Sequence, residues 1–173
     1  MDPLTFLDQM IKSSDGTSFE RLLPPITDFR QCHGVVPPER RILYRCRRLP
    51  SSSSATPNNA DEEQYILKIK VQIPDSTEAA NQPAQTSLPN HSDATAHELA
   101  ALQIFRDAGT NHAPRLVAFD SQQQRPDALL SGGYISCTVM TTLPGKSLFD
   151  LGYWSLEAED REEIQQHFLE ALT

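Results

Sequence analysis

The sequence predicts an α+β fold, with an antiparallel sheet, one helix packed on it and a second helix after it. Two observations lead to this prediction. Four segments have the apolar pattern of β-strands, at residues 41–49, 65–73, 115–120 and 133–143. A helical pattern lies between the second and third of these segments, and another begins at about residue 155. With 173 residues the chain is long enough for one domain, which takes roughly 100–200 residues.

The first two predicted strands form an antiparallel pair. In the strand at 41–49, every second residue from Ile42 to Cys46 is apolar, which is the two-residue period of a pleated strand. The strand at 65–73, Tyr-Ile-Leu-Lys-Ile-Lys-Val-Gln-Ile, is apolar apart from its two lysines and Gln72, and this indicates a central, buried strand. The polar residues 50–64 between the two strands predict a flexible connector.

A second polar segment, residues 74–92, separates this strand pair from the first helix. Ser92 or Asp93 is the candidate N-cap, because a side-chain oxygen at that position accepts hydrogen bonds from free backbone N–H groups. Gly109 is the candidate C-terminal stop. The face expected to pack on the sheet is apolar apart from one carboxylate and consists of Ala94, Glu98, Ala101, Leu102 and Phe105.

The two ends of the chain also carry helical patterns. Residues 1–39 are interpreted as an N-terminal extension, in which Asp2 can cap a short helix over residues 2–11. At the other end, the helix expected from about Ser155 gathers its apolar residues on one face.

Composition and charge narrow the function classes. The net charge of -8 argues against a general nucleic-acid-binding protein. The five arginines between Arg40 and Arg48 leave two interpretations, a phosphate or RNA patch or a solvated strand edge, and the acidic remainder favours the edge. No stretch reaches the roughly 18 apolar residues that span a membrane, and the N-terminus does not resemble a secretory signal. We therefore expect neither nucleic acid nor membrane as a partner.

Three cysteines, Cys32, Cys46 and Cys137, lie far apart in the sequence without a CxxC pair. This pattern predicts neither a disulfide framework nor a zinc site. Because reduced thiols are typical of the cytosol, a cytoplasmic location is expected.

Lys68 and Glu98 are the most informative pair of residues. Lys68 lies in the middle of a mostly apolar strand, and Glu98 lies on the apolar face of the helix that follows. Burying either charge alone costs several kcal/mol, so both placements are explained if the two side chains form an ion pair. The alternative is that Lys68 extends to solvent and Glu98 lies at the edge of the helix. A strand lysine held by a helix glutamate is a device for binding the phosphates of ATP.

The order of these elements, together with the stretch Met-Thr-Thr-Leu-Pro-Gly-Lys-Ser-Leu at residues 140–148, resembles the N-terminal lobe of the protein-kinase-like superfamily. The chain is most similar to the aminoglycoside phosphotransferase branch. The resemblance covers roughly residues 40–173. It implies a kinase-like N-lobe at residues 40–143, with loops 50–64 and 74–92, then a hinge and the first helices of a truncated second lobe at 144–173.

The resemblance implies an ATP site on the lobe. Lys68 would orient the phosphates and Glu98 would hold Lys68, with Lys70 as a rival for the lysine role. Ile66 would lie on the adenine side of the strand.

The rest of the implied site lies where the fourth strand meets the hinge. Met140 would fill the gatekeeper position there, and backbone groups of Thr141 and Leu143 would contact the adenine edge.

The chain departs from the family pattern in two respects. The glycine-rich loop GxGxxG is missing between the first two strands, and residues 32–38, which precede them, hold a single glycine. The catalytic loop and the metal-binding aspartate would follow the C-terminal helix, in the missing part of the second lobe, so Mg²⁺ ligands are expected only there. We therefore expect residues 1–173 alone to be inactive in phosphoryl transfer, with no catalytic and no metal-binding residue among them.

Two functions are compatible with this sequence: the ATP-binding lobe of a phosphotransferase whose phosphoryl acceptor is unknown, and a non-catalytic protein-interaction module derived from such a lobe. Both leave the interface to the second lobe open. Self-association through exposed Leu143, Leu148, Phe149 and Trp154 is therefore expected.

Overall fold

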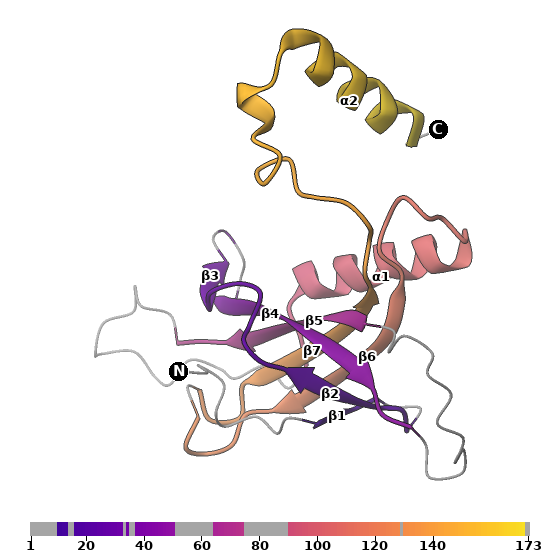
Figure 1. Ribbon diagram of the computed structural model, residues 1–173. Coiled ribbons are helices and arrows are strands. Elements are labelled where there is room, and N and C mark those ends of the chain that lie inside the picture. The colour runs from indigo at the N-terminus through magenta and orange to yellow at the C-terminus, as the bar shows by residue number, and fades with distance from the viewer. Residues whose placement is uncertain are drawn as a thin grey trace.

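The computed structural model describes residues 10–13, 16–32, 34, 37–50, 64–74, 90–128 and 130–171. In these residues, seven strands form one sheet, helix α1 covers one of its faces, and α2 follows the last strand (Figure 1). The α+β class predicted from the sequence is confirmed. The elements are β1 (Met10–Lys12), β2 (Ser18–Leu22), β3 (Arg30–Cys32), β4 (Glu39–Arg48), β5 (Gln64–Gln72), α1 (Asp93–Asp107), β6 (Leu116–Gln123), β7 (Tyr134–Thr141), the short 3-10 helix η1 (Tyr153–Ser155) and α2 (Ala158–Ala171).

The strands run in the order β1-β2-β4-β5-β7-β6, and each neighbouring pair is antiparallel. β3 pairs with the first residues of β4, on the edge that β2 occupies further along the strand. The mostly apolar strand β5 lies between β4 and β7, as its composition predicted. In this register Lys68 lies between Leu43 of β4 and Thr138 of β7, which places it in the middle of the sheet.

The alternation of side chains along β5 separates two environments. Tyr65, Leu67, Ile69 and Val71 point into the apolar core, so Lys68 and its neighbours two residues away point to the opposite face, under α1. The core on the first face consists of Ile11, Phe19, Ile42, Tyr44, Cys46, Tyr65, Leu67, Ile69, Val71, Ala118, Ile135, Cys137 and Val139.

Helix α1 begins and ends as predicted. The Ser92 side chain accepts a hydrogen bond from the backbone N–H of Thr95, and this N-cap supports the first turn. After Asp107 the chain turns at Gly109, whose φ of 66° is readily adopted only by glycine. The predicted strands at 41–49 and 65–73 are also confirmed as an antiparallel pair, β4 and β5.

The predicted helix at 2–11 is wrong at its C-terminal end, where Met10 and Ile11 belong to strand β1. Ile11 is buried opposite Phe19 of β2, so pairing across the sheet prevails over the local helical pattern. Residues 2–9 lie outside the described residues. So do 51–63 of the predicted connector and 75–89 of the second predicted loop.

Other boundaries also differ from the prediction. β4 begins at Glu39, before the predicted residue 41, because β3 and β5 both pair with its start. β6 continues to Gln123, into the predicted turn, because it stays paired with β7. The C-terminal helix begins at Ala158 rather than at about Ser155, which belongs to η1.

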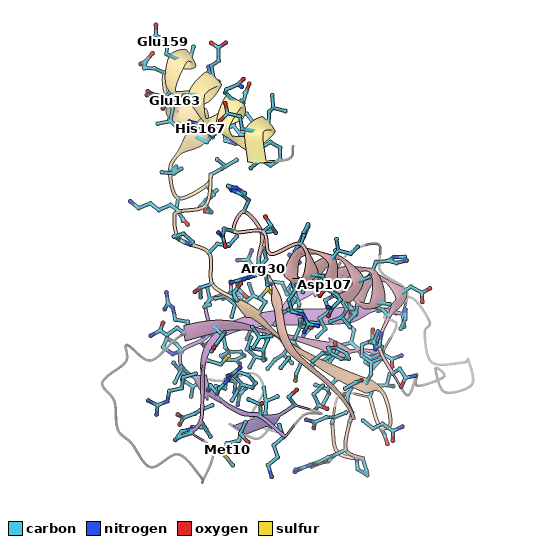
Figure 2. The ribbon with its side chains drawn as sticks, turned by 90° about the vertical axis from the view of Figure 1, so that its right-hand side faces the viewer. Met10, Arg30, Asp107, Glu159, Glu163 and His167 are labelled. Carbon is cyan, nitrogen blue, oxygen red and sulfur yellow. The ribbon has the colours of Figure 1, made fainter. Side chains whose placement is uncertain are left out.

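Helix α2 stands away from the sheet at the end of an extended segment (Figure 1). Glu159, Glu163 and His167, spaced one turn apart, follow one side of this helix (Figure 2). Within the described part of the chain, neither helix has the length and apolar content needed to cross a membrane.

Candidate functional site

Lys68 and Glu98 form the predicted ion pair. The Lys68 ammonium donates to the Oε1 atom of Glu98, which projects from the second turn of α1 toward the sheet. The two side chains are 17% and 25% exposed, so the pair is partly buried. The ion-pair prediction is confirmed, and solvent reaches one side of it.

Lys70, the rival lysine, is held more tightly. Its Nζ atom lies 2.9 Å from Thr95 Oγ1, 2.9 Å from Glu98 Oε2 and 3.5 Å from Glu39 Oε1. The ammonium group of Lys70 is therefore surrounded by one hydroxyl and two carboxylates. The Lys70 side chain is only 8% exposed, so Lys68 is the more accessible of the two lysines.

Glu39 is the buried anion at the base of this network. Its Oε2 atom accepts hydrogen bonds from the hydroxyl of Ser92 at 3.0 Å and from the hydroxyl of Tyr134 at 2.8 Å. The side chain is 1% exposed, so these bonds and Lys70 replace the water that a carboxylate requires. Ser92 is also the N-cap of α1, so Glu39 fixes the start of the helix over the sheet.

Glu39 and Tyr134 were not predicted as members of the site. In the sequence, Glu39 lies 53 residues before Ser92 and 95 residues before Tyr134. No local spacing therefore marks them. The one local signal is a single carboxylate at the start of an arginine-rich strand.

The surroundings of Glu98 and Tyr134 shift their pKa values in opposite directions. Burial alone would raise the pKa of Glu98, but hydrogen bonds from Lys68 and Lys70 and the charges of both lysines hold it below its ordinary value. Burial raises the pKa of Tyr134, and the hydrogen bond to the Glu39 carboxylate and its charge raise it further. Glu98 is therefore an anion at neutral pH, and Tyr134 is a neutral hydrogen-bond donor.

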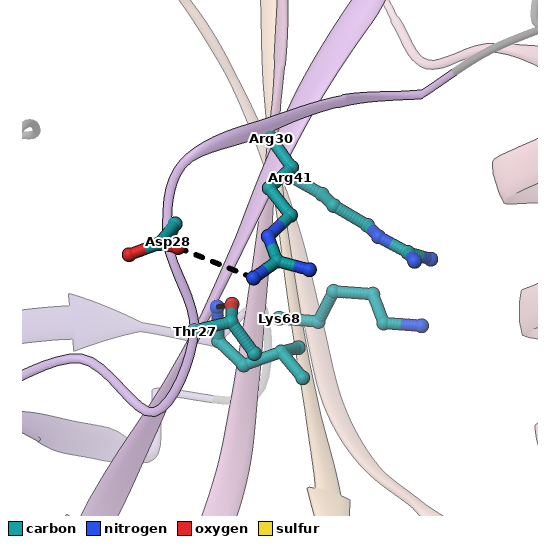
Figure 3. Close-up of a pocket in the computed structure, with 6 residues that line it drawn as sticks. Thr27, Asp28, Arg30, Arg41 and Lys68 are labelled. Atoms are coloured by element: carbon teal, nitrogen blue, oxygen red, sulfur yellow. Dashed lines mark hydrogen bonds and ion pairs between the residues drawn. The ribbon is translucent and has the colours of Figure 1, made fainter. Parts of the chain in front are cut away.

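Lys68 borders a small pocket on the α1 side of the sheet (Figure 3). The segment between β2 and β3 folds over β4 here: the Ile26 N–H donates to the Leu43 carbonyl at 2.7 Å, and the Leu43 N–H donates to the Thr27 hydroxyl at 3.1 Å. The enclosed volume is about 170 Å³. The lining residues are Thr27, Asp28, Arg30, Arg41, Leu43 and Lys68.

The pocket is electropositive. Three of its six lining side chains are cationic and one is a carboxylate. Arg30 forms an ion pair with Asp28 at 3.2 Å, and both are well exposed. Figure 3 shows Arg41 and Lys68 extending in the same direction from adjacent strands. The guanidinium groups of the two arginines and the ammonium group of Lys68 can bind the oxygens of a phosphate.

The other predicted site residues do not line this pocket. Ile66 is opposite Met140 in the β5–β7 register, two residues from Lys68 and on the same face. The N–H of Thr141 donates to the Arg115 carbonyl at 3.0 Å and is not available to an adenine. Leu143 follows the end of β7 and is exposed, and the expected contact of its backbone with an adenine stays a prediction.

The chain contains one His-x-Asp tripeptide, His91-Ser92-Asp93. It occurs at the start of α1, where Ser92 is the N-cap, and not in a loop after a second-lobe helix. Its position before Glu98 does not match that of a kinase catalytic loop. Among the described residues, no group of three or more His, Cys, Asp or Glu side chains comes together as a metal site would require.

Comparison of the chain with protein-family models, with curated proteins and with solved structures gives no match. The chemistry of the site is that of its cationic side chains, Arg30, Arg41 and Lys68, which can bind and neutralise an anion.

Proposed function

We propose that this chain is the ATP-binding lobe of a kinase-like phosphotransferase, similar to the aminoglycoside phosphotransferase branch. The observation that supports it best is the ion pair between Lys68 of a central strand and Glu98 of the packed helix, at the edge of a cationic pocket. The order of strand, helix, two strands and Leu-Pro-Gly segment is consistent with that assignment. The cytoplasmic location belongs to the same proposal.

In this proposal the phosphates of ATP enter the pocket beside Lys68. A volume of about 170 Å³ is smaller than the roughly 300–1,000 Å³ of pockets that hold a whole drug-sized ligand. The adenosine part therefore lies outside the pocket, over Ile66 and toward Leu143. One step of two residues along a strand, roughly 6.6 Å, separates Ile66 from Lys68 and leaves room for a ribose between them.

The described residues do not fit the Mg²⁺ ion that accompanies ATP in such enzymes. Mg²⁺ requires oxygen ligands, chiefly carboxylates and waters. The Glu98 carboxylate is engaged by two lysines, and Asp28 is paired with Arg30. We therefore assign no metal ligand and derive no catalytic step from these residues, and we expect no ATP turnover by residues 1–173.

Calorimetric titration of the purified chain with ATP tests the proposal. We expect weak binding that Lys68→Ala reduces by about 10- to 100-fold, because a hydrogen bond to a charged group contributes about 1.5–3 kcal/mol. The matched control is Lys12→Ala, which removes an exposed lysine of β1 outside the pocket and is expected to bind ATP like the wild type. Absence of ATP binding by the wild type, or equal binding by Lys68→Ala, would contradict the proposal.

The second candidate is a non-catalytic interaction module with a second copy of the chain as partner. It is favoured by a groove of about 630 Å³ that α2 forms with the segment before it. The lining residues are Lys146, Ser147, Leu148, Tyr153, Ile164, Gln165, Phe168 and Leu169. Self-association without ATP binding would favour this candidate over the first.

A further inference from the structure

The pocket beside Lys68 is lined by side chains of β4, β5 and the segment from Thr27 to Arg30. A kinase-like lobe binds phosphate with backbone N–H groups of a glycine-rich loop, and this sequence contains no GxGxxG motif. Some other group has to face the phosphate oxygens from the β4 side of the pocket. The side chain in that position is Arg41.

Arg41 lies in a row of cations that crosses three strands. In the sheet register, Arg30 of β3 is opposite Arg41 of β4, and Arg41 is opposite Lys70 of β5. Residues directly opposite one another in a sheet project from the same face, and like charges in such pairs destabilise the fold. A row of three cations is therefore a cost to stability unless negative charge lies close by.

The protein supplies negative charge to two of these cations. Lys70 is held between Glu39 and Glu98, and Arg30 pairs with Asp28. Arg41 has no ion-pair partner among the residues that the structure describes. Lys68, on the other side of the pocket, already shares the carboxylate of Glu98 with Lys70. Among the described residues, Arg41 is thus the exposed cation of this pocket that has no carboxylate partner.

We propose that Arg41 is the phosphate-binding residue that takes the place of the glycine-rich loop, with its guanidinium and the ammonium of Lys68 binding the phosphate chain of a nucleotide from two sides. This inference rests on the proposed function and names the group that receives the phosphates. A guanidinium can offer two parallel N–H donors to one phosphate, which Lys cannot. Arg30 is a further donor, because its exposed pair with Asp28 contributes little and opens readily.

The test compares three ligands and three variants of the full chain by calorimetric titration. The ligands are ATP, adenosine and inorganic tripolyphosphate, which separate the nucleoside contribution from that of the phosphates. The variants are Arg41→Gln, Arg41→Lys and the control Arg125→Gln. Arg125 is exposed in the connection between β6 and β7 and does not line the pocket, so its substitution removes the same charge elsewhere.

We expect Arg41→Gln to weaken ATP and tripolyphosphate binding by about 10- to 100-fold, the range for one charge-assisted hydrogen bond. Adenosine binding should not change. Arg41→Lys should recover part of the loss, because it keeps the charge and loses the two-pronged geometry. Arg125→Gln should bind all three ligands like the wild type.

Unfolding experiments provide a second measurement, which distinguishes a loss of binding from a loss of folding. Without ligand, Arg41→Gln should be at least as stable as the wild type, because the repulsion from Arg30 and Lys70 is removed. Added tripolyphosphate should raise the unfolding midpoint of the wild type more than that of Arg41→Gln. Equal stabilisation of both proteins would overturn the inference.

The outcomes also separate this inference from the proposed function. If Arg41→Gln binds ATP like the wild type while Lys68→Ala does not, the inference is wrong and the proposed function stands. If tripolyphosphate binding depends on Arg41 but ATP binds no more tightly than tripolyphosphate, Arg41 is an anion-binding residue and the proposed nucleotide function is wrong. If the wild type binds neither ATP nor tripolyphosphate, the inference and the proposed function are both wrong.

Discussion

The Nζ atom of Lys70 lies 2.9 Å from the Oε2 atom of Glu98, and Lys68 occupies the other oxygen of the same carboxylate. One helix carboxylate thus connects two lysines that differ in their surroundings. Lys70 is enclosed by Glu39, Thr95 and Glu98, whereas Lys68 borders the pocket. This arrangement separates a structural lysine from one that can meet a ligand, and it predicts that their substitutions have different effects.

Lys70→Met should destabilise the protein more than Lys68→Met. Removing one partner of a buried pair leaves an uncompensated charge and costs about 3–5 kcal/mol, and Glu39 would be left in that state. Lys68 is more exposed, and Glu98 keeps Lys70 when Lys68 is removed, so the cost should be about 1 kcal/mol. Urea unfolding of both variants measures the difference. Equal losses would show that the two lysines share one structural role.

The stability of the protein should fall in acid partly because of Glu98. Its pKa in the folded state lies below the ordinary value of 4.5, so the folded state favours the carboxylate more than the unfolded chain does. The stabilising contribution is complete above the unfolded pKa and is lost as the pH falls through the folded pKa. Glu98→Gln should therefore lower stability at neutral pH and show a smaller decrease below about pH 4.5.

Urea unfolding of the wild type and Glu98→Gln across the acid range checks this prediction. Asp107→Asn is the control, because it removes an exposed carboxylate at the end of the same helix. It should keep the acid dependence of the wild type. Parallel curves for the wild type and Glu98→Gln would contradict the assigned role of the carboxylate.

The sequence was sufficient to predict the elements whose signals are local. β5 was identified by its continuous apolar pattern and α1 by the Ser92 cap and the Gly109 stop. The Lys68–Glu98 pair was predictable because each charge lies among mostly apolar residues of the sequence. The kinase-like assignment and the ATP contacts remain proposals.

The rest depends on long-range pairing and could not be read from local pattern. β1 and β3 have three residues each, too few for a periodic signal, and exist because β2 and β4 pair with them. The pocket was also missed. Its lining combines residues that are distant in sequence: the N–H of Leu43 donates to the Thr27 hydroxyl 16 residues earlier, and β3, which carries Arg30, pairs with β4.

The three cysteines should differ sharply in reactivity toward a disulfide reagent. Burial raises the pKa of Cys46 and of Cys137 to about 12, so roughly one thiol in ten thousand is ionised at about pH 8. Cys32 is less buried, although burial and the nearby Glu39 raise its pKa as well. In the native protein we expect one slow reaction, assigned by its loss in Cys32→Ser, and three reactions in urea. Fast labelling of a second native thiol would show that the core around Cys46 and Cys137 is open.

The apolar segment between β7 and α2 should cause self-association. Phe149 and Trp154 are 90% and 83% exposed, and Leu143 and Leu148 are about half exposed, as expected from the sequence. The amide of Gln165 donates to the hydroxyl of Tyr153 at 2.7 Å, which connects α2 to η1 beside the groove. Burying one large side chain contributes about 1.5–3 kcal/mol, so several of them can hold two copies together at high concentration.

Light scattering across a concentration series measures this association. The average mass of the wild type should rise above that of the monomer with concentration. Phe149→Glu and Trp154→Glu should each keep the protein monomeric, because a carboxylate in the contact would be costly to bury. Ile104→Glu is the matched control, since Ile104 is 64% exposed on α1, away from this segment, and should associate like the wild type. If all three variants associate equally, or if the wild type stays monomeric, the segment is not the contact surface between copies.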